Sequence, residues 1–278
     1  MLPVAKLTNT NYLDSYSIER AGTEMVTARY KAPFMEVLRL IELDKIDPFG
    51  LKLYRVKGPF FDTLARVRNG LLGTEKASFC CASYDPDGHG YFYVSNIDGA
   101  NKGGWQAHIQ HIYTSDDRAL PHLRTSLTRN PSNPDYSSVL DTLAFDCEAD
   151  TRICFQFGAK ASGYVNPRVV APAPVNVRGQ ISRMPTWHGQ YLYWSANYQT
   201  ASGETGMMIK RAVIKGFDTR TNMLEFGPAE EVVKTKRPGL IGFGEPSLTD
   251  NGDLYAAAAS IDPATGHVNI VPVVFYQR

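Results

Sequence analysis

Acidic residues stand at three places where the sequence predicts the start of an inner strand. They are Glu75, Asp135 and Glu245. Carboxyl groups can give and take protons during a reaction, so all three are candidates for acid and base roles. Glu245 is the best placed, because it directly precedes Pro246 in a segment that repeats along the chain. The alternative is that each acid caps a turn or pairs with a nearby Lys or Arg.

Other side chains could bind a ligand beside these acids. Arg183 could pair with an anion, and His188 stands next to a Gly in an expected loop. Aromatic faces suit sugar rings and flat organic ligands in a partly apolar pocket. The expected substrate-binding residues are Arg183, His188, Trp105, Trp187 and Tyr198. The alternative for the aromatic residues is that they fill the core between sheets.

The sequence predicts neither a metal nor a cofactor. His108 and His111 are three residues apart, but the pattern around them is that of a strand, which places them on opposite faces. No zinc-binding Cys pattern, P-loop or dinucleotide fingerprint occurs. The Gly-rich segment 99–104 leads from one strand to another, which indicates a turn and not a phosphate cradle.

A repeated hairpin pattern predicts the elements that position these residues. Its clearest copy runs from Pro246 through an Asn251-Gly252 turn to Tyr255, and weaker copies lie at 184–193 and 83–93. Asn-Gly between two strand-like runs is a strong hairpin signal. Divergent repeats of this kind predict an all-β propeller of four-stranded antiparallel blades, in one domain that spans residues 1–278.

Large apolar residues in the expected second strands indicate the number of blades. They recur at intervals of roughly 40 to 60 residues, which suits four-stranded blades with variable loops, at Leu53, Phe92, Leu143, Leu192 and Leu254. Five such positions predict five blades, and a sixth blade in the N-terminal region is the alternative. In that region we expect a strand near 25–30, while 34–46 fits a helix or a strand equally well.

Composition excludes several classes of partner. The 278 residues carry a formal net charge of +1, from 29 basic and 28 acidic residues. This balance lacks the basic footprint of a nucleic-acid binder. Apolar runs fall far short of the roughly 18 residues that suggest a membrane span, and the N-terminus lacks a signal-peptide pattern. We therefore expect a small-molecule or carbohydrate ligand, no nucleic acid and no membrane; a protein partner stays open.

The cysteines bear on the cellular compartment. If 143–157 is a hairpin centred on Asp150 and Thr151, Cys147 and Cys154 face one another across its strands. A disulfide is one expectation, and two buried thiols are the other. The chain as written fits the cytoplasm, whereas a mature chain with this disulfide fits secretion or the periplasm.

Two segments resemble a known type of propeller blade. Residues 84–95 and 248–255 look like the "Ser-Pro-Asp-Gly, then Leu-Tyr" core of TolB-like and WD-repeat-like blades. The resemblance extends over about residues 50–278 and implies the fold, but almost no chemistry. Residues 137–141 depart from it, because they contain no Gly.

The acidic residues give a second resemblance, to five-bladed propellers that act on sugars, of the arabinanase and fructosidase type. Those proteins carry acids at the starts of inner strands that point into a central funnel. The resemblance implies glycoside cleavage, in which one carboxyl protonates the leaving oxygen and a second carboxylate attacks or activates water. The segment around Met184 departs from it, since it contains no acid, and Asp47-Pro48 is only the nearest match to the N-terminal Asp-Pro signature.

Three functions follow from these features. The first is an enzyme directed at a small molecule or carbohydrate, a glycoside hydrolase with paired carboxylates in the funnel. The second is a propeller without catalysis that binds a glycan or a protein. The third is a lyase or cyclase with a Tyr or His as proton donor. We favour the enzyme, because a lone propeller most readily places its function in the pocket.

Overall fold

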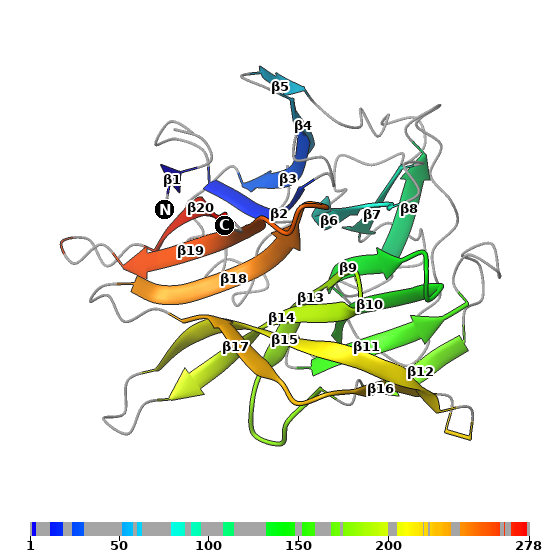
Figure 1. Cartoon of the computed structure of the whole chain (residues 1–278). Coiled ribbons are helices and arrows are strands. Elements are labelled where there is room, and N and C mark those ends of the chain that lie inside the picture. Colours follow the sequence, from blue (N-terminus) through cyan, green and yellow to red (C-terminus); the bar gives the residue numbers. More distant parts are fainter. Residues whose placement is uncertain are drawn as a thin grey trace, which may run out of the picture.

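The computed structural model describes only part of the chain. The described residues are 2–3, 12–18, 24–30, 52–57, 60–62, 79–86, 90–95, 108–113, 132–147, 152–158, 168–172, 175–199, 205–218, 220–221, 223–234, 240–261, 264 and 268–276. Their secondary structure is all β (Figure 1), as expected. No helix in these ranges is long and apolar enough to cross a membrane.

The strands form four sheets, in which almost all neighbours are antiparallel. Two sheets hold the first part of the chain, namely β2 (Tyr12–Ile18), β3 (Glu24–Tyr30), β4 (Lys52–Lys57) and β5 (Phe60–Asp62), then β6 (Phe79–Tyr84), β7 (Gly90–Ser95) and β8 (His108–Tyr113). The third sheet contains β9 (Ser132–Ser137), β10 (Thr142–Cys147), β11 (Arg152–Phe157) and β12 (Arg168–Pro172).

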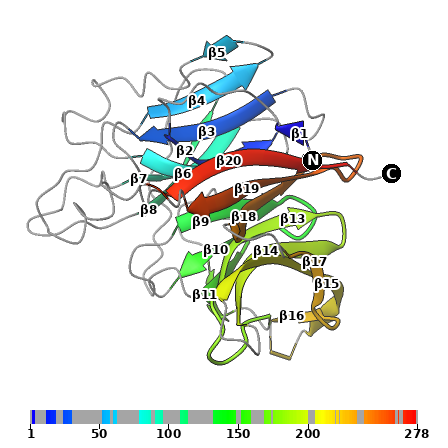
Figure 2. The same cartoon turned by 90° about the vertical axis from the view of Figure 1, so that its left-hand side faces the viewer.

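The fourth sheet is the largest and has two halves. One half contains β13 (Ser182–His188), β14 (Tyr191–Gln199), β15 (Thr205–Asp218), β16 (Met223–Phe226) and β17 (Glu230–Val233). The other contains β18 (Leu240–Leu248), β19 (Leu254–Ile261), β20 (Val268–Phe275) and β1 (Leu2–Pro3). In Figure 2 this second half lies between the first half and the β2–β5 sheet.

A single parallel pair joins the two halves of this sheet. Met207 of β15 pairs with Gly242 of β18, which has a φ of 153°. A Cβ atom at Gly242 would overlap the backbone of Met207. Only a residue without a side chain therefore allows the two strands to approach this closely.

The strands that begin successive antiparallel units contact one another around a ring. β2 contacts β6, β6 contacts β9, β9 contacts β13, β13 contacts β18, and β18 contacts β2. At the chain ends, β1 pairs with β20 (Figure 1). The ring therefore brings together strands from the two ends of the described chain.

Each of these five strands carries a β-bulge against its neighbour in the sheet. In three of them the bulge contains a non-glycine residue with positive φ, followed by a Pro. These residues are Asn133 (φ 46°), Met184 (φ 55°) and Glu245 (φ 51°). Such residues are uncommon in this region of φ, and bulges re-aim side chains. Asn133, Met184 and Glu245 thus hold equivalent positions on three strands of the ring.

Two apolar clusters fill the spaces on either side of β14. Leu192 and Trp194 pack with residues of the third sheet such as Phe155, while Tyr193 packs with residues of β18 and β19 such as Phe243. Successive residues of this strand point to opposite faces, and both faces carry aromatic or aliphatic side chains. β14 therefore separates two packed layers.

The expected hairpins form, although one turn differs in length. β13 and β14 are joined by the two residues Gly189 and Gln190, and Gly189 has a φ of 55°. By contrast, Leu248 pairs with Leu254, so the predicted Asn-Gly turn is a five-residue loop. In that loop, Gly252 N donates to Thr249 O. The side chain of Thr249 and its neighbours provide the additional hydrogen bonds that favour the longer loop.

The segment without a Gly, residues 137–141, also forms a hairpin turn. Asp141 takes the positive φ, at 43°, and its Oδ1 accepts a 2.7 Å hydrogen bond from the Tyr136 hydroxyl. Asp tolerates this conformation better than most residues because its short polar side chain bonds locally. The departure from the repeat therefore leaves the hairpin intact.

Two of the five positions used to count the repeat are misplaced. Leu143, Leu192 and Leu254 hold matching places on the second strand of their hairpins. Each belongs to the second residue pair after the bulge in the first strand, counted toward the hairpin turn. Phe92 belongs to the first pair after the bulge and not to the second. The neighbouring residues are also aromatic, so the alternation in the sequence does not single out the matching position. Leu53 lies on β4, the third strand of its sheet, opposite Ala28 of β3.

Other expectations about strands are confirmed where the structure describes them. β3 covers the strand expected near 25–30. His108 and His111 lie on the same strand at odd spacing, hence on opposite faces. Segments 34–46 and 99–104 lie outside the described residues.

Candidate functional site

Glu245 lies in the bulge of β18, on the ring of contacting strands. Its residue is 7% exposed, and its φ of 51° belongs to the left-handed region. Its backbone N–H donates to Met184 Sδ at 3.3 Å. A buried acid on a residue with an uncommon backbone conformation is a candidate functional group, because such conformations persist only where the surroundings enforce them.

Met184 contacts this acid from β13. A Cβ built on Gly244 would lie 3.2 Å from Met184 Sδ and 3.7 Å from Ser195 Oγ. Ser195 is paired in register with Arg183 on the neighbouring strand β14. Arg183, the expected anion partner, is therefore on the strand that contacts β18, one residue before Met184.

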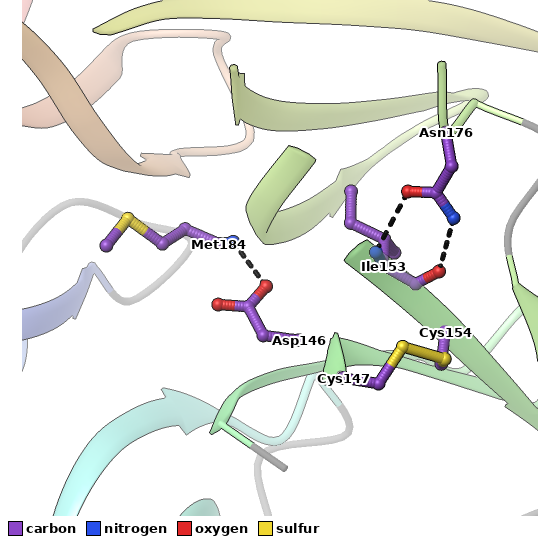
Figure 3. The surroundings of a disulfide bond; sticks show 6 residues. All are labelled: Asp146, Cys147, Ile153, Cys154, Asn176 and Met184. Atoms are coloured by element: carbon purple, nitrogen blue, oxygen red, sulfur yellow. Dashed lines mark hydrogen bonds between the residues drawn. A yellow bond between two sulfur atoms is a disulfide. The ribbon is translucent and has the colours of Figure 1, made fainter. Parts of the chain in front are cut away.

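Asp146 joins the third sheet to β13 (Figure 3). It is fully buried, at 0% exposure. Its Oδ1 accepts a 2.5 Å hydrogen bond from Met184 N, and its Oδ2 accepts bonds from Asn133 Nδ2 at 2.7 Å and Ser132 Oγ at 3.5 Å. A buried carboxylate with several donors is a strong structural acceptor. Asp146 thus fixes the backbone of Met184 in its bulge.

Asp135, an expected catalytic residue, makes the same kind of link. Its Oδ2 accepts from Trp187 N at 2.6 Å and from Thr186 Oγ1 at 2.9 Å, both on β13. These bonds assign the carboxylate a role in holding two sheets together. A catalytic role for Asp135 stays a prediction.

A disulfide closes the hairpin that carries Asp146 (Figure 3). Cys147 and Cys154 are bonded, with Cα atoms 5.8 Å apart, so the expected disulfide is confirmed. Cys147 lies opposite Arg152 in register, so the hairpin is centred slightly earlier than expected and the bond runs diagonally. Asn176 bonds both the N–H and the C=O of Ile153, at 3.0 and 2.8 Å. The end of this hairpin is therefore held by covalent and polar links.

The other expected ligand-binding residues lie in different surroundings. Trp187 is 6% exposed and packs against Phe155, with ring centroids 5.3 Å apart, which is the environment of a core residue. Lys234 Nζ lies 4.7 Å from the ring centroid of Tyr198. Half-buried His188 lies edge-on to Tyr193 at 6.4 Å, at the far end of β13 from the bulge.

A surface cluster lies near His188, where Arg211 stacks over Tyr191 at 4.9 Å. Hydrogen bonds from Arg211 to the Tyr193 hydroxyl and to Glu230 raise the pKa of Arg211 above its ordinary value. This arginine is a fully paired cation. It contrasts with Arg183, for which the described residues provide no ion-pair partner.

Several expected residues cannot be placed. Glu75, Trp105 and the Asp47-Pro48 pair lie outside the described residues. Within the described ranges, no cluster of His, Cys, Asp and Glu has the arrangement of a metal site.

The fold also indicates a candidate that the sequence pattern did not reveal. Asp14 of β2 pairs with Ala28 just before the bulge of β2. This is the register position that Arg183 holds in β13 and Gly244 in β18. Since β2 contacts β18, the backbone places Asp14 on the strand next to Glu245. No Pro or hairpin signal marks it in the sequence, which is why it was missed.

Comparisons with known proteins show the class of fold. No protein family and no curated protein matches the sequence. Solved structures do match over nearly the whole chain, and they include glycoside hydrolases with the β-propeller fold. The chain therefore has the fold of a β-propeller.

Three of these structures illustrate the similarity. A family-43 endo-arabinanase from Bacillus licheniformis has a TM-score of 0.54 and 12% identity, covering 98% of this chain and 96% of its own. A thermostable family-43 glycoside hydrolase has a TM-score of 0.57, 10% identity, and coverage of 98% and 92%. An α-L-arabinofuranosidase from Podospora anserina has a TM-score of 0.54, 7% identity, and coverage of 99% and 94%. Identities this low concern the fold alone.

Proposed function

We propose that this chain is a single five-bladed propeller domain that hydrolyses glycosidic bonds, with Glu245 as the central acid. The observation that carries the proposal is Glu245 itself, a buried carboxyl held in a left-handed bulge on the ring of inner strands. The ring of five contacting strands supports the blade number. The similarity to arabinanase and arabinofuranosidase structures supports the choice of substrate class.

Glycoside cleavage needs a second carboxylate. Asp135 and Asp146 both accept hydrogen bonds that link sheets, so neither is well suited to attack a sugar or activate water. Asp14 is the best candidate, because its strand is next to β18 and its register position adjoins that of Glu245. Glu75 remains the candidate expected from the sequence. We therefore propose Glu245 with Asp14, and Glu75 as the alternative partner.

The test is an assay for hydrolysis of arabinan, arabinoxylan, xyloglucan and polygalacturonan. The release of reducing ends is measured. We expect wild type to cleave at least one of them. Glu245→Gln should lower the rate by roughly 10³-fold, as loss of an acid or base does, while circular dichroism and the unfolding midpoint stay unchanged. Asp14→Asn should lower it by a similar factor.

The matched control is Asp250→Asn. Asp250 is an exposed acid in the loop that follows β18, so its loss should leave the rate within about twofold. A rate that is equal in Glu245→Gln and wild type would refute the assignment of Glu245.

A second function is favoured by the residues equivalent to Glu245. Met184 and Asn133 hold the matching bulge positions, and neither can act as an acid at neutral pH. The second proposal is therefore a propeller that binds a glycan without cleaving it. Binding of an intact glycan by wild type, with no release of reducing ends at any pH, would favour it over hydrolysis.

A further inference from the structure

Three inner strands are linked through their left-handed bulges. Asn133 Nδ2 of β9 donates to Asp146 Oδ2 at 2.7 Å, and Met184 N of β13 donates to Asp146 Oδ1 at 2.5 Å. Met184 Sδ in turn accepts a 3.3 Å bond from Glu245 N of β18. The three bulge residues with positive φ therefore belong to one series of contacts, which ends at the candidate acid.

The thioether of Met184 is the last link in this series. Met184 is half-buried, and its side chain extends away from Asp146 (Figure 3). The absence of a side chain at Gly244 gives the sulfur room, since a Cβ there would lie only 3.2 Å from Met184 Sδ. The sequence Gly244-Glu245 thus lets the sulfur reach the backbone N–H of the acid.

This contact acts on the backbone conformation of Glu245. A φ of 51° is uncommon for a residue other than Gly, and it persists only where the surroundings enforce it. A bulge sets the direction of its side chain, so a change of φ at Glu245 would move the carboxyl group. A thioether is a weak acceptor, but here it is anchored through Met184 N to the fully buried carboxylate of Asp146.

We propose that Met184 is a positioning residue for Glu245, whose carboxyl it directs through the hydrogen bond between Sδ and the Glu245 N–H. The inference rests on the proposed function and adds to it a residue that acts through the acid. It also explains why β13 departs from the expected pattern of acids at the starts of inner strands. Met184 holds the position equivalent to Glu245 and supports the acid of the neighbouring strand.

Two substitutions separate this role from simple packing. Met184→Leu conserves the apolar volume but removes the acceptor, and swaps of this kind cost little stability. Met184→Asn is smaller, but its side-chain oxygen is as many bonds from Cα as Sδ is. Asn also tolerates positive φ, as Asn133 does at the equivalent position. A packing role predicts that Leu is the better replacement, and a positioning role predicts that Asn is.

The first readout is hydrolysis of the polysaccharide that wild type cleaves. We expect Met184→Leu to lower kcat by roughly ten- to a hundredfold, as a small displacement of a catalytic group does, with KM within about twofold. Met184→Asn should retain a higher kcat than Met184→Leu. The inference is overturned if kcat of Met184→Leu stays within about twofold of wild type or exceeds that of Met184→Asn.

The matched control is Met223→Leu. Met223 is a half-buried methionine on β16, so its replacement should leave kcat within about twofold. An equal loss of kcat in Met223→Leu and Met184→Leu would show a general effect of losing a methionine and would overturn the inference.

A second readout does not depend on hydrolysis or on Met184→Asn. Protein with isotope-labelled glutamate gives one amide NMR signal for each Glu, and Glu245→Gln identifies the signal of Glu245. We expect this amide to exchange with solvent at least about tenfold faster in Met184→Leu than in wild type and Met223→Leu. With that result and no cleavage of any polysaccharide, the positioning contact stands and only the proposed function fails. Equal exchange in wild type and Met184→Leu would refute the inference whatever the hydrolysis assay shows.

Discussion

The two sides of β13 are joined to their neighbours in different ways. Toward the third sheet, Asp135 and Asp146 accept hydrogen bonds from the backbone of β13, and the junction is held by charged acceptors. Toward β18, Arg183 Nε and Ser195 Oγ have no partner. On the third-sheet side Trp187 Nε1 is unpaired as well, so the difference between the two junctions lies in the buried carboxylates that bond to β13 from the third sheet.

The largest expected effect is on the side of the third sheet. Asp146→Ala removes the acceptor for Met184 N and Asn133 Nδ2 and leaves these donors unsatisfied. We expect the free energy of unfolding to fall by roughly 3–4 kcal/mol, measured by urea denaturation. Asp146→Asn, which keeps one oxygen acceptor, should cost less. A loss below about 1 kcal/mol in Asp146→Ala would show that this junction is not held by its carboxylate.

The disulfide next to Asp146 should contribute somewhat less. Closing the short loop between Cys147 and Cys154 restricts the unfolded chain, and the chain-entropy estimate for a loop of this size is about 2 kcal/mol. We expect a reductant to lower the unfolding midpoint of wild type, and not that of the Cys147→Ala/Cys154→Ala variant. A midpoint that is insensitive to reductant in both proteins would contradict a stabilising role.

On the side of β18, removing the polar group of Arg183 should not destabilise the fold. Arg183→Met replaces a partly shielded, unpaired cation by an apolar chain of similar length. We expect the free energy of unfolding to stay the same or to rise by about 1 kcal/mol, in the same urea experiment. A clear loss of stability would mean that Arg183 supports the fold, and the contrast between the two sides of β13 would disappear.

The smallest effect concerns a paired arginine on the surface. Arg211 lies 2.9 Å from Glu230, with side-chain exposures of 37% and 59%. Exposed pairs of this kind contribute little, so Arg211→Met should cost at most about 1 kcal/mol, and added salt should reduce the difference from wild type. If Arg211→Met were more destabilising than Asp146→Ala, burial would not explain how much each charged side chain contributes to the free energy of unfolding.

Local features of the fold follow from the sequence, because their signals lie within a few residues. Gly189 marks the turn between β13 and β14, and the short spacing of Cys147 and Cys154 predicts their disulfide. Met184-Pro185 and Glu245-Pro246 even mark two of the bulges. Phe92 was assigned one ladder pair out of step because aromatic residues flank it on both sides.

The contacts that define the candidate site do not follow from the sequence. Asp146 bonds a backbone N–H that is 38 residues away, and Asp135 bonds one 52 residues away. No local pattern distinguishes an acid that joins two sheets from one that faces a ligand. Asp14 was overlooked for a related reason, since only the contact between β2 and β18 places it near Glu245.

That contact between β2 and β18 has a consequence for the kinetics of folding. It joins residues 12–18 to residues 240–248, so the sequence between them must be closed into a loop before the contact forms. Contacts over such long separations are formed late and lower the folding rate of β proteins. The strand that carries Glu245 should therefore gain its final neighbour only near the end of folding, after its own hairpin with β19 has formed.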